Sequence, residues 1–200
     1  TASFMRPASQ QTTAQGAFNA NQELKSQIEL IRSAIQECVL IYDGGDRSGT
    51  PLENAPWPIN PSSAYHASTA ANDNLEFLKC PGNPGDSNDH VSIFGGASGK
   101  FMPPPPKLFE EWEYYNGTDG VFFYIRTDKT DAFIQSALIK LDEDYSECQA
   151  DVIDASGGDI ELTSTAAAGD PKCLDDETCF RVWMIIRPSA VYNGDTDGEE

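Results

Sequence analysis

The chain has 200 residues, 39% of them hydrophobic, so it can bury a core, and its length fits one domain better than two. Its 32 acidic and 13 basic residues give a formal net charge of -19 at pH 7. Because that charge repels phosphate groups, nucleic acids and anionic membrane surfaces are poor candidate partners.

The first predicted element is a helix over residues 13–42. Apolar side chains recur along one helical face in steps of four and three, at Leu24, Ile28, Ile31, Ile35, Cys38 and Tyr42. The same phase reaches back to Ala14 and Ala17, where the face carries only small residues. We therefore expect the second half of the helix to pack on its own domain and the first half to project or meet another molecule. Gly44 and Gly45 are expected to end the helix.

Residues 43–120 hold most of the prolines and many glycines, which exclude long regular elements. Large apolar residues are interspersed among them, and these are expected to anchor an ordered, irregular loop region to the core. The segment 116–120 reads as a turn, and Asn116 also begins a glycosylation sequon there.

Regular structure resumes after this turn. Residues 121–127 predict a strand because they are rich in aromatic and β-branched side chains. Apolar residues at helical spacing predict a second, short helix over residues 131–141. Two short strands are expected at 149–153 and 159–163, and a final apolar strand at 180–187. Strands that follow a helix in this way predict an α+β fold with an antiparallel sheet.

No catalytic motif is present. The segment 94–101 is similar to a phosphate-binding loop, but it has Phe94 and Phe101 where glycine and a hydroxyl residue are required. His66 and His90 have no partner at helical spacing, and no strained nucleophile turn occurs. We predict that the protein is not an enzyme.

A calcium site is one hypothesis for the C-terminal segment. Asn193, Asp195 and Asp197 place oxygen ligands at alternate positions before a glycine, as the first half of a calcium loop does. Glu199, Glu200 or the acidic residues at 175–177 would have to complete the coordination. The alternative is an acidic tail over residues 191–200 without a metal, and no other cofactor is expected.

The five cysteines favour disulfides over a metal or redox site, because no pair has the C-x-x-C spacing. They are Cys38, Cys80, Cys148, Cys173 and Cys179. Cys173 and Cys179 enclose a short acidic loop that suits a disulfide in an oxidising compartment, and the odd count leaves one thiol over. No run of about 18 apolar residues and no signal peptide is present, so the chain as given reads as soluble. From its abrupt start at Thr1 we expect that a targeting or anchoring segment precedes this part in the natural protein.

The order of features resembles type IV pilin and pseudopilin-like proteins over residues 13–141. The resemblance rests on the long helix with a cysteine near its end and on four short phrases: Leu78-Lys79-Cys80-Pro81-Gly82, Pro103 to Pro106 before Phe109, Trp112-Glu113-Tyr114-Tyr115-Asn116, and Gly120-Val121. It implies a pilin-like α+β head at 13–190, with the long helix packed on an antiparallel sheet and an irregular αβ-loop region between them. Residues 1–12 would then be a remnant of the stem.

In such proteins a leader and an apolar helical segment precede the part seen here, so the full-length form is expected to be anchored in the inner membrane on its periplasmic side. Its partners would be other pilin subunits, contacted through the N-terminal helix, and the machinery that assembles pili or secretion filaments. The resemblance also implies a disulfide between Cys38 and Cys80. Cys173–Cys179 is the second expected pair, and Cys148 paired with either of these two stays open.

The resemblance therefore predicts a structural subunit of a type IV pilus or type II secretion-type filament, acting in surface attachment, motility, uptake or secretion. Without the apolar segment, this chain is expected to be monomeric or weakly associated in solution. The alternative is a secreted surface- or carbohydrate-binding adhesin module that uses Trp57, Tyr65 and Trp112 as an aromatic platform. For Trp112, Tyr114 and Trp183, however, we expect core positions.

Overall fold

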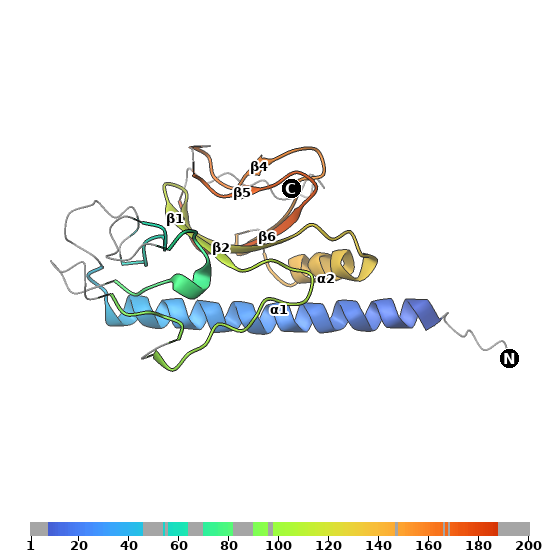
Figure 1. Ribbon diagram of the computed structural model, residues 1–200, viewed down its shortest axis with the longest axis horizontal. Helices are drawn as coiled ribbons and strands as arrows, with labels where there is room; N and C mark the ends of the chain where they lie inside the picture. Colours follow the sequence, from blue (N-terminus) through green and yellow to red (C-terminus); the bar gives the residue numbers. More distant parts are fainter. Residues whose placement is uncertain are drawn as a thin grey trace.

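The computed structural model describes residues 8–45, 54, 56–63, 70–81, 90–95, 98–146, 148–165, 167 and 169–187, and the side chains from residue 12 onward. These residues form three layers, with the long helix on one side of the sheet and a small hairpin on the other (Figure 1). In chain order the elements are α1 (Ala8–Ile41), the short 3-10 helix η1 (Leu75–Phe77), β1 (Glu113–Gly117), β2 (Gly120–Thr127), α2 (Ala132–Glu143), β3 (Ala150–Asp154), β4 (Ile160–Glu161), β5 (Lys172–Cys173) and β6 (Thr178–Ile186).

Helix α1 confirms the predicted N-terminal helix and begins five residues earlier than expected. Its apolar stripe is buried as the spacing requires, with Leu24, Ile28, Ile31 and Ile35 fully covered. Cys38 continues the stripe into the last turns. The helix ends before Gly45, which adopts a positive φ of 59° that favours glycine.

The first half of α1 packs against another element of the same chain, whereas its small-residue face had predicted that it would project or meet another molecule. Helix α2 packs across it, and the buried contacts are made by Ala17, Ala20 and Ala137, with Phe133 beside them. A Cβ atom placed on Gly16 would lie 3.3 Å from the Phe133 ring. Small side chains allow the two helices to approach closely, so this face binds an element of the same chain. The N-terminal end of α1 reaches past α2 (Figure 1).

The four-stranded sheet has the order β1-β2-β6-β3 and is antiparallel throughout. Strands β2, β3 and β6 and helix α2 confirm four predicted elements within a few residues at each end. The strand expected at 159–163 is only two residues long in the structure, as β4, and it pairs with β5. Strands β1 and β5 were not predicted, and β1 lies inside the region that was expected to be irregular.

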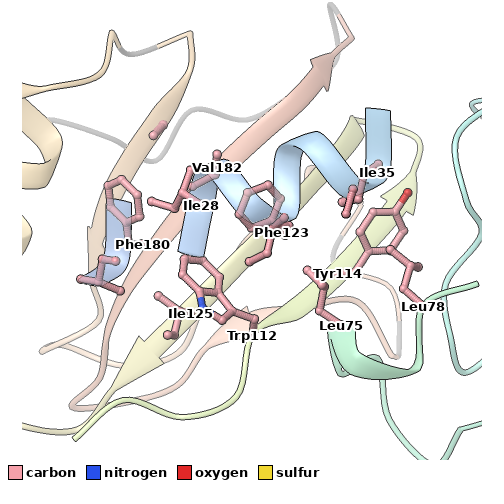
Figure 2. Close-up of a cluster of buried hydrophobic side chains, with 14 of the residues drawn as sticks. Ile28, Ile35, Leu75, Leu78, Trp112, Tyr114, Phe123, Ile125, Phe180 and Val182 are labelled. Atoms are coloured by element: carbon pink, nitrogen blue, oxygen red, sulfur yellow. The ribbon is translucent and has the colours of Figure 1, made fainter. Parts of the chain in front are cut away.

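Both faces of the central strands are covered. The inner face packs against α1 in the main core, where Phe123 and Ile125 of β2 lie beside Val182 of β6 and Ile28 of α1 (Figure 2). The outer face packs against the β4–β5 hairpin in a second, outer core. The buried members of the outer core are Tyr115, Phe122, Tyr124, Ile153, Ala155, Leu162, Cys173, Cys179 and Trp183. Burial on both faces explains why β2 reads as one continuous apolar run.

The described parts of the long loop region are anchored only in part as expected, because Phe77 and Phe101, two of the apolar residues expected to anchor it, are exposed. Leu75, Leu78 and Ile93 are buried in the main core. An isolated bridge pairs Asn74 with Glu113, so this segment lies along the outer edge of β1. The region therefore covers an edge that would otherwise expose unpaired backbone groups.

Two disulfides are present, Cys38–Cys80 and Cys173–Cys179, the pairs that the sequence analysis put forward. Cys148 is free and exposed, which accounts for the odd count. Disulfides indicate an oxidising environment outside the cytoplasm. Among the helices of the described residues, none combines the length and the apolarity that a membrane span needs.

Candidate functional site

The residues proposed for calcium, Asn193, Asp195 and Asp197, lie outside the described residues, so the calcium hypothesis stays a prediction. Within the described part of the chain, one group of possible metal ligands comes together, formed by Cys173, Glu177 and Cys179. Both of its thiols are joined in a disulfide. A thiolate site for a metal is therefore ruled out there while the disulfide is intact.

The aromatic platform suggested for an adhesin is wrong for Trp112. This side chain is 1% exposed, and its Nε1 donates a hydrogen bond of 2.7 Å to Gln27 Oε1 on α1. Its ring also meets Phe123 edge to face, with centroids 5.4 Å apart. Trp57 packs against the main core, and Tyr65 lies outside the described residues. Trp112 thus stabilises the contact between helix and sheet, and no ligand can stack on it.

The sequon at Asn116 has no free amide in the fold. Asn116 Nδ2 donates a 2.7 Å hydrogen bond to the carbonyl oxygen of Pro58, and Asn116 Oδ1 accepts one of 2.9 Å from Asn54 Nδ2. This network fixes the loop to the β1–β2 turn. Asn116 therefore has a structural role in this turn, through the hydrogen bonds of its side-chain amide.

A pocket of about 260 Å³ lies on the outer face of the sheet, and we call it the outer pocket. It opens where the edge of β1 and β2 meets the segment that leads into and out of β5. Polar and aromatic residues dominate its wall, which is formed by Asp73, Glu113, Tyr114, Tyr115, Tyr124, Arg126, Gly169, Asp170, Pro171, Lys172 and Leu174. Tyr115 and Tyr124 of its wall belong to the outer core, and β5 beside it lies on the opposite side of the sheet from α1 (Figure 1).

Arg126 is neutralised by carboxylates around it. Its Nε lies 2.8 Å from Glu110 Oε2 and its Nη2 lies 3.1 Å from Glu113 Oε1, while Nη1 is 3.9 Å from Glu177 Oε2. Tyr124 Oη donates a 2.7 Å hydrogen bond to the other oxygen of Glu113. Burial, followed by the charge of Glu113, raises the pKa of Tyr124, so its hydroxyl stays protonated and keeps donating.

Asp170 is held in place by its own loop. One of its oxygens, Oδ2, accepts hydrogen bonds from Thr165 Oγ1 at 2.6 Å, Ala167 N at 2.9 Å and Thr163 Oγ1 at 3.0 Å. Partial burial raises its pKa, but the hydrogen bonds from Thr165, Ala167 and Thr163 outweigh burial, and the pKa falls below its usual value. Asp170 is therefore ionised over the whole neutral range.

Asp73 and Lys172 complete the charged wall of the pocket. Asp73 Oδ1 accepts a 2.9 Å hydrogen bond from the backbone N–H of Ser62. Lys172 Nζ lies 2.5 Å from Glu161 Oε1 on the neighbouring strand, and that contact is the largest cause of the raised pKa of Lys172. Among the described residues, neither Asp73 nor Asp170 takes part in an ion pair.

Sequence reasoning missed the outer pocket because its residues come from four separate segments and match no local motif. Glu113 and Arg126 belong to paired strands, whereas Asp73 and Asp170 belong to loops almost a hundred positions apart. One signal was present, since Arg126 is a charged residue at the end of an apolar strand. This position indicated that the Arg126 side chain would be exposed or paired with an acid, but it did not indicate which acidic residues would pair with it.

The sequence matches no protein-family model, and no curated protein or solved structure is significantly similar to it. What the chain does must therefore be argued from its own residues and their arrangement.

Proposed function

We propose that this chain is the extracytoplasmic head of a type IV pilin-like or pseudopilin-like subunit. The observation that carries the proposal is helix α1. It has 34 residues, lies along a four-stranded antiparallel sheet, and reaches past α2 at its N-terminal end (Figure 1). A head domain of this shape presents a helix from which assembly can proceed.

The exposed face of α1 supports assembly through this helix. Phe18 is 58% exposed and Leu30 is 37% exposed, although neither contributes to the core of the head. Scattered apolar residues on a surface are common, but on this helix they lie where neighbouring subunits would pack. Burying them against another helix would stabilise a filament without disturbing the head.

The Cys38–Cys80 disulfide fits the same role. It joins the last turns of α1 to the loop region across 42 positions of sequence. This link holds the helix end against the head when force is transmitted along a filament. It also limits unfolding of the loop region outside the cell.

The mature N-terminus of the natural protein tests the proposal. We expect the coding sequence upstream of Thr1 to encode a short basic leader that ends in glycine, followed by an apolar segment with glutamate at its fifth position. Mass spectrometry of protein purified from cells should then show cleavage after that glycine and a methylated N-terminal residue. An ordinary cleavable signal peptide, with Thr1 close to the mature start, would contradict the proposal and favour a secreted binding module.

A further inference from the structure

Three possible metal ligands meet where β5 is connected to β6. Cys173 ends β5, Cys179 is the second residue of β6, and Glu177 precedes β6. One ligand atom of each residue lies within 4.8 Å of the other two. Both cysteines are fully buried, and Glu177 is 8% exposed. The disulfide occupies both sulfur atoms, so metal binding by this group requires that the bond be open.

Backbone pairing holds the two cysteines in place independently of the disulfide. Cys179 pairs with Ile153 of β3, and Cys173 pairs with Ile160 of β4. Opening the bond between the sulfur atoms removes neither of these pairings. The two thiols of the reduced chain therefore stay close enough to share one metal ion.

The surroundings of Cys173 and Glu177 also suit the reduced state. Cys173 Sγ lies 3.7 Å from the carbonyl oxygens of Ile153 and Glu177, and either oxygen can accept a hydrogen bond from a thiol. The Glu177 side chain is held by Leu174, whose backbone N–H donates a 3.1 Å hydrogen bond to Oε2. Within the described residues, Glu177 Oε1 accepts no hydrogen bond, so one carboxylate oxygen is left for a metal.

The kind of metal follows from the ligands and the charges around them. Two thiolates with one carboxylate suit Zn²⁺, whereas Ca²⁺ and Mg²⁺ prefer oxygen ligands alone. These three ligands and one Zn²⁺ ion sum to a single negative charge. Arg126 lies beside that charge, with its Nη1 3.9 Å from Glu177 Oε2, and compensates it in part.

We propose that Cys173, Cys179 and Glu177 bind one Zn²⁺ ion when their disulfide is reduced. The metal takes both thiolates and an oxygen of the Glu177 carboxylate, and a water molecule completes the tetrahedron. Each thiol gives up its proton when the metal binds, so the affinity increases with pH. The inference does not depend on the proposed filament, because both cysteines belong to the outer core, on the face of the sheet away from α1.

The reduced state is reached by thiol–disulfide exchange with a dithiol. One thiolate of the dithiol attacks a sulfur atom and releases the other cysteine, and its second thiol then releases the first cysteine. Two electrons pass to the disulfide, and the dithiol leaves as a disulfide. Because both sulfur atoms are buried, the exposed turn at 174–176 must open for this attack. The newly made chain offers the same ligands before the disulfide forms.

Titration of the reduced, full 200-residue chain with Co²⁺ tests this inference, because thiolates bound to Co²⁺ give a charge-transfer absorption band. The variant Cys148→Ala, reduced with a phosphine, removes the free exposed thiol and serves as the reference protein. We expect the band to saturate at one Co²⁺ ion per chain and to disappear when Zn²⁺ displaces the cobalt. Adding Cys173→Ser and Cys179→Ser to the reference protein should abolish the band, although Cys38 and Cys80 are kept.

The variant Glu177→Gln distinguishes the folded site from two cysteines that bind a metal without it. In the reference protein it should weaken Co²⁺ binding at least about tenfold, because a charged ligand is replaced by a neutral amide. Equal affinity with and without Glu177→Gln would overturn the proposal, and this result is also expected if the reduced chain unfolds and binds through its thiols alone. No charge-transfer band, or an equal band after Cys173→Ser with Cys179→Ser, would overturn it as well.

Discussion

Arg181 is a fully buried charged residue of the fold, and its contacts explain how the outer core tolerates it. Its guanidinium forms a two-point ion pair with Asp151 on β3, with Nε 2.9 Å from Asp151 Oδ1. Nη1 donates a 2.6 Å hydrogen bond to the carbonyl oxygen of Leu162. The guanidinium carbon also lies 4.6 Å from the centre of the Trp183 ring. One side chain thus connects β6, β3 and the segment after β4.

Replacing Arg181 with methionine should lower the free energy of unfolding by about 3–5 kcal/mol, because Asp151 would then be a buried charge without a partner. Denaturant unfolding measures this loss. The double variant Arg181→Met, Asp151→Leu should lose less than the sum of the two single variants, since no charge is left uncompensated. Additive losses, or a loss below about 1 kcal/mol for Arg181→Met, would show that the pair has no such role.

Glu177 should titrate above the ordinary glutamate value of 4.5, because burial raises its pKa and the carboxylates of Glu110 and Asp128 raise it further. A carboxyl group with a higher pKa in the folded state binds protons more readily when folded. Its contribution to stability therefore increases as the pH falls from neutral toward 4.5. Carbon-detected NMR titration of the Glu177 carboxyl group gives the pKa directly.

The variant Glu177→Gln is the control for this titration, since glutamine can still accept the hydrogen bond that Leu174 donates to Glu177 Oε2. As the pH falls from neutral toward 4.5, the free energy of unfolding of the wild type should rise relative to that of Glu177→Gln. A Glu177 pKa at or below 4.5 would contradict the account.

Gly120 should be intolerant of a side chain. Its φ is 135°, and a Cβ atom there would lie 2.1 Å from the backbone oxygen of Ile185 on β6. Because that oxygen belongs to a paired strand, Gly120→Ala should cost more than about 2 kcal/mol of unfolding free energy. Gly157, where a Cβ would meet nothing within 4 Å, provides the matched control. Its replacement by alanine should change stability by no more than about 0.5 kcal/mol, and similar losses at both sites would refute the explanation.

At the scale of elements, the sequence pattern was sufficient to predict α1, α2 and the strands β2, β3 and β6, since each buries a regular stripe or an apolar run. It was insufficient for β1, whose sequence Glu113 to Gly117 mixes acidic, aromatic and turn-forming residues. That strand is specified by its partner β2 and by the segment at Asn74 that covers its edge. The outer pocket was missed for the same reason, because pairing between distant segments has no local signature. The packing of α2 on the small residues of α1 likewise depends on Phe133 and Ala137, far along the chain.

The two disulfides should contribute unequally to stability because they close loops of different length. Cys38 and Cys80 are 42 positions apart, whereas Cys173 and Cys179 are six apart. Loop-closure entropy predicts losses of about 4 kcal/mol for Cys38→Ala with Cys80→Ala and about 2 kcal/mol for Cys173→Ala with Cys179→Ala. Denaturant unfolding of the two double variants gives the comparison. A larger loss for the short loop would mean that packing of the buried sulfur atoms outweighs chain entropy.

At the scale of the whole molecule, the sheet separates two different surfaces. On one side α1 buries its apolar stripe and exposes Phe18 and Leu30, and on the other side the β4–β5 hairpin covers the sheet (Figure 1). In the proposed filament the helix would serve assembly and the outer face would remain accessible. The two disulfides suit such a molecule to an environment outside the cytoplasm.

Incorporation of the full-length protein into surface filaments tests the central claim most directly. Filaments sheared from cells that produce the protein would be examined by immunogold electron microscopy, together with the variant Phe18→Gln on α1 and the control Leu174→Gln on the opposite side of the sheet. The account predicts labelled filaments for the wild type and the control, and markedly fewer for Phe18→Gln at an equal amount of folded protein. Protein recovered only as a released monomer, with no labelled filament in any sample, would contradict it.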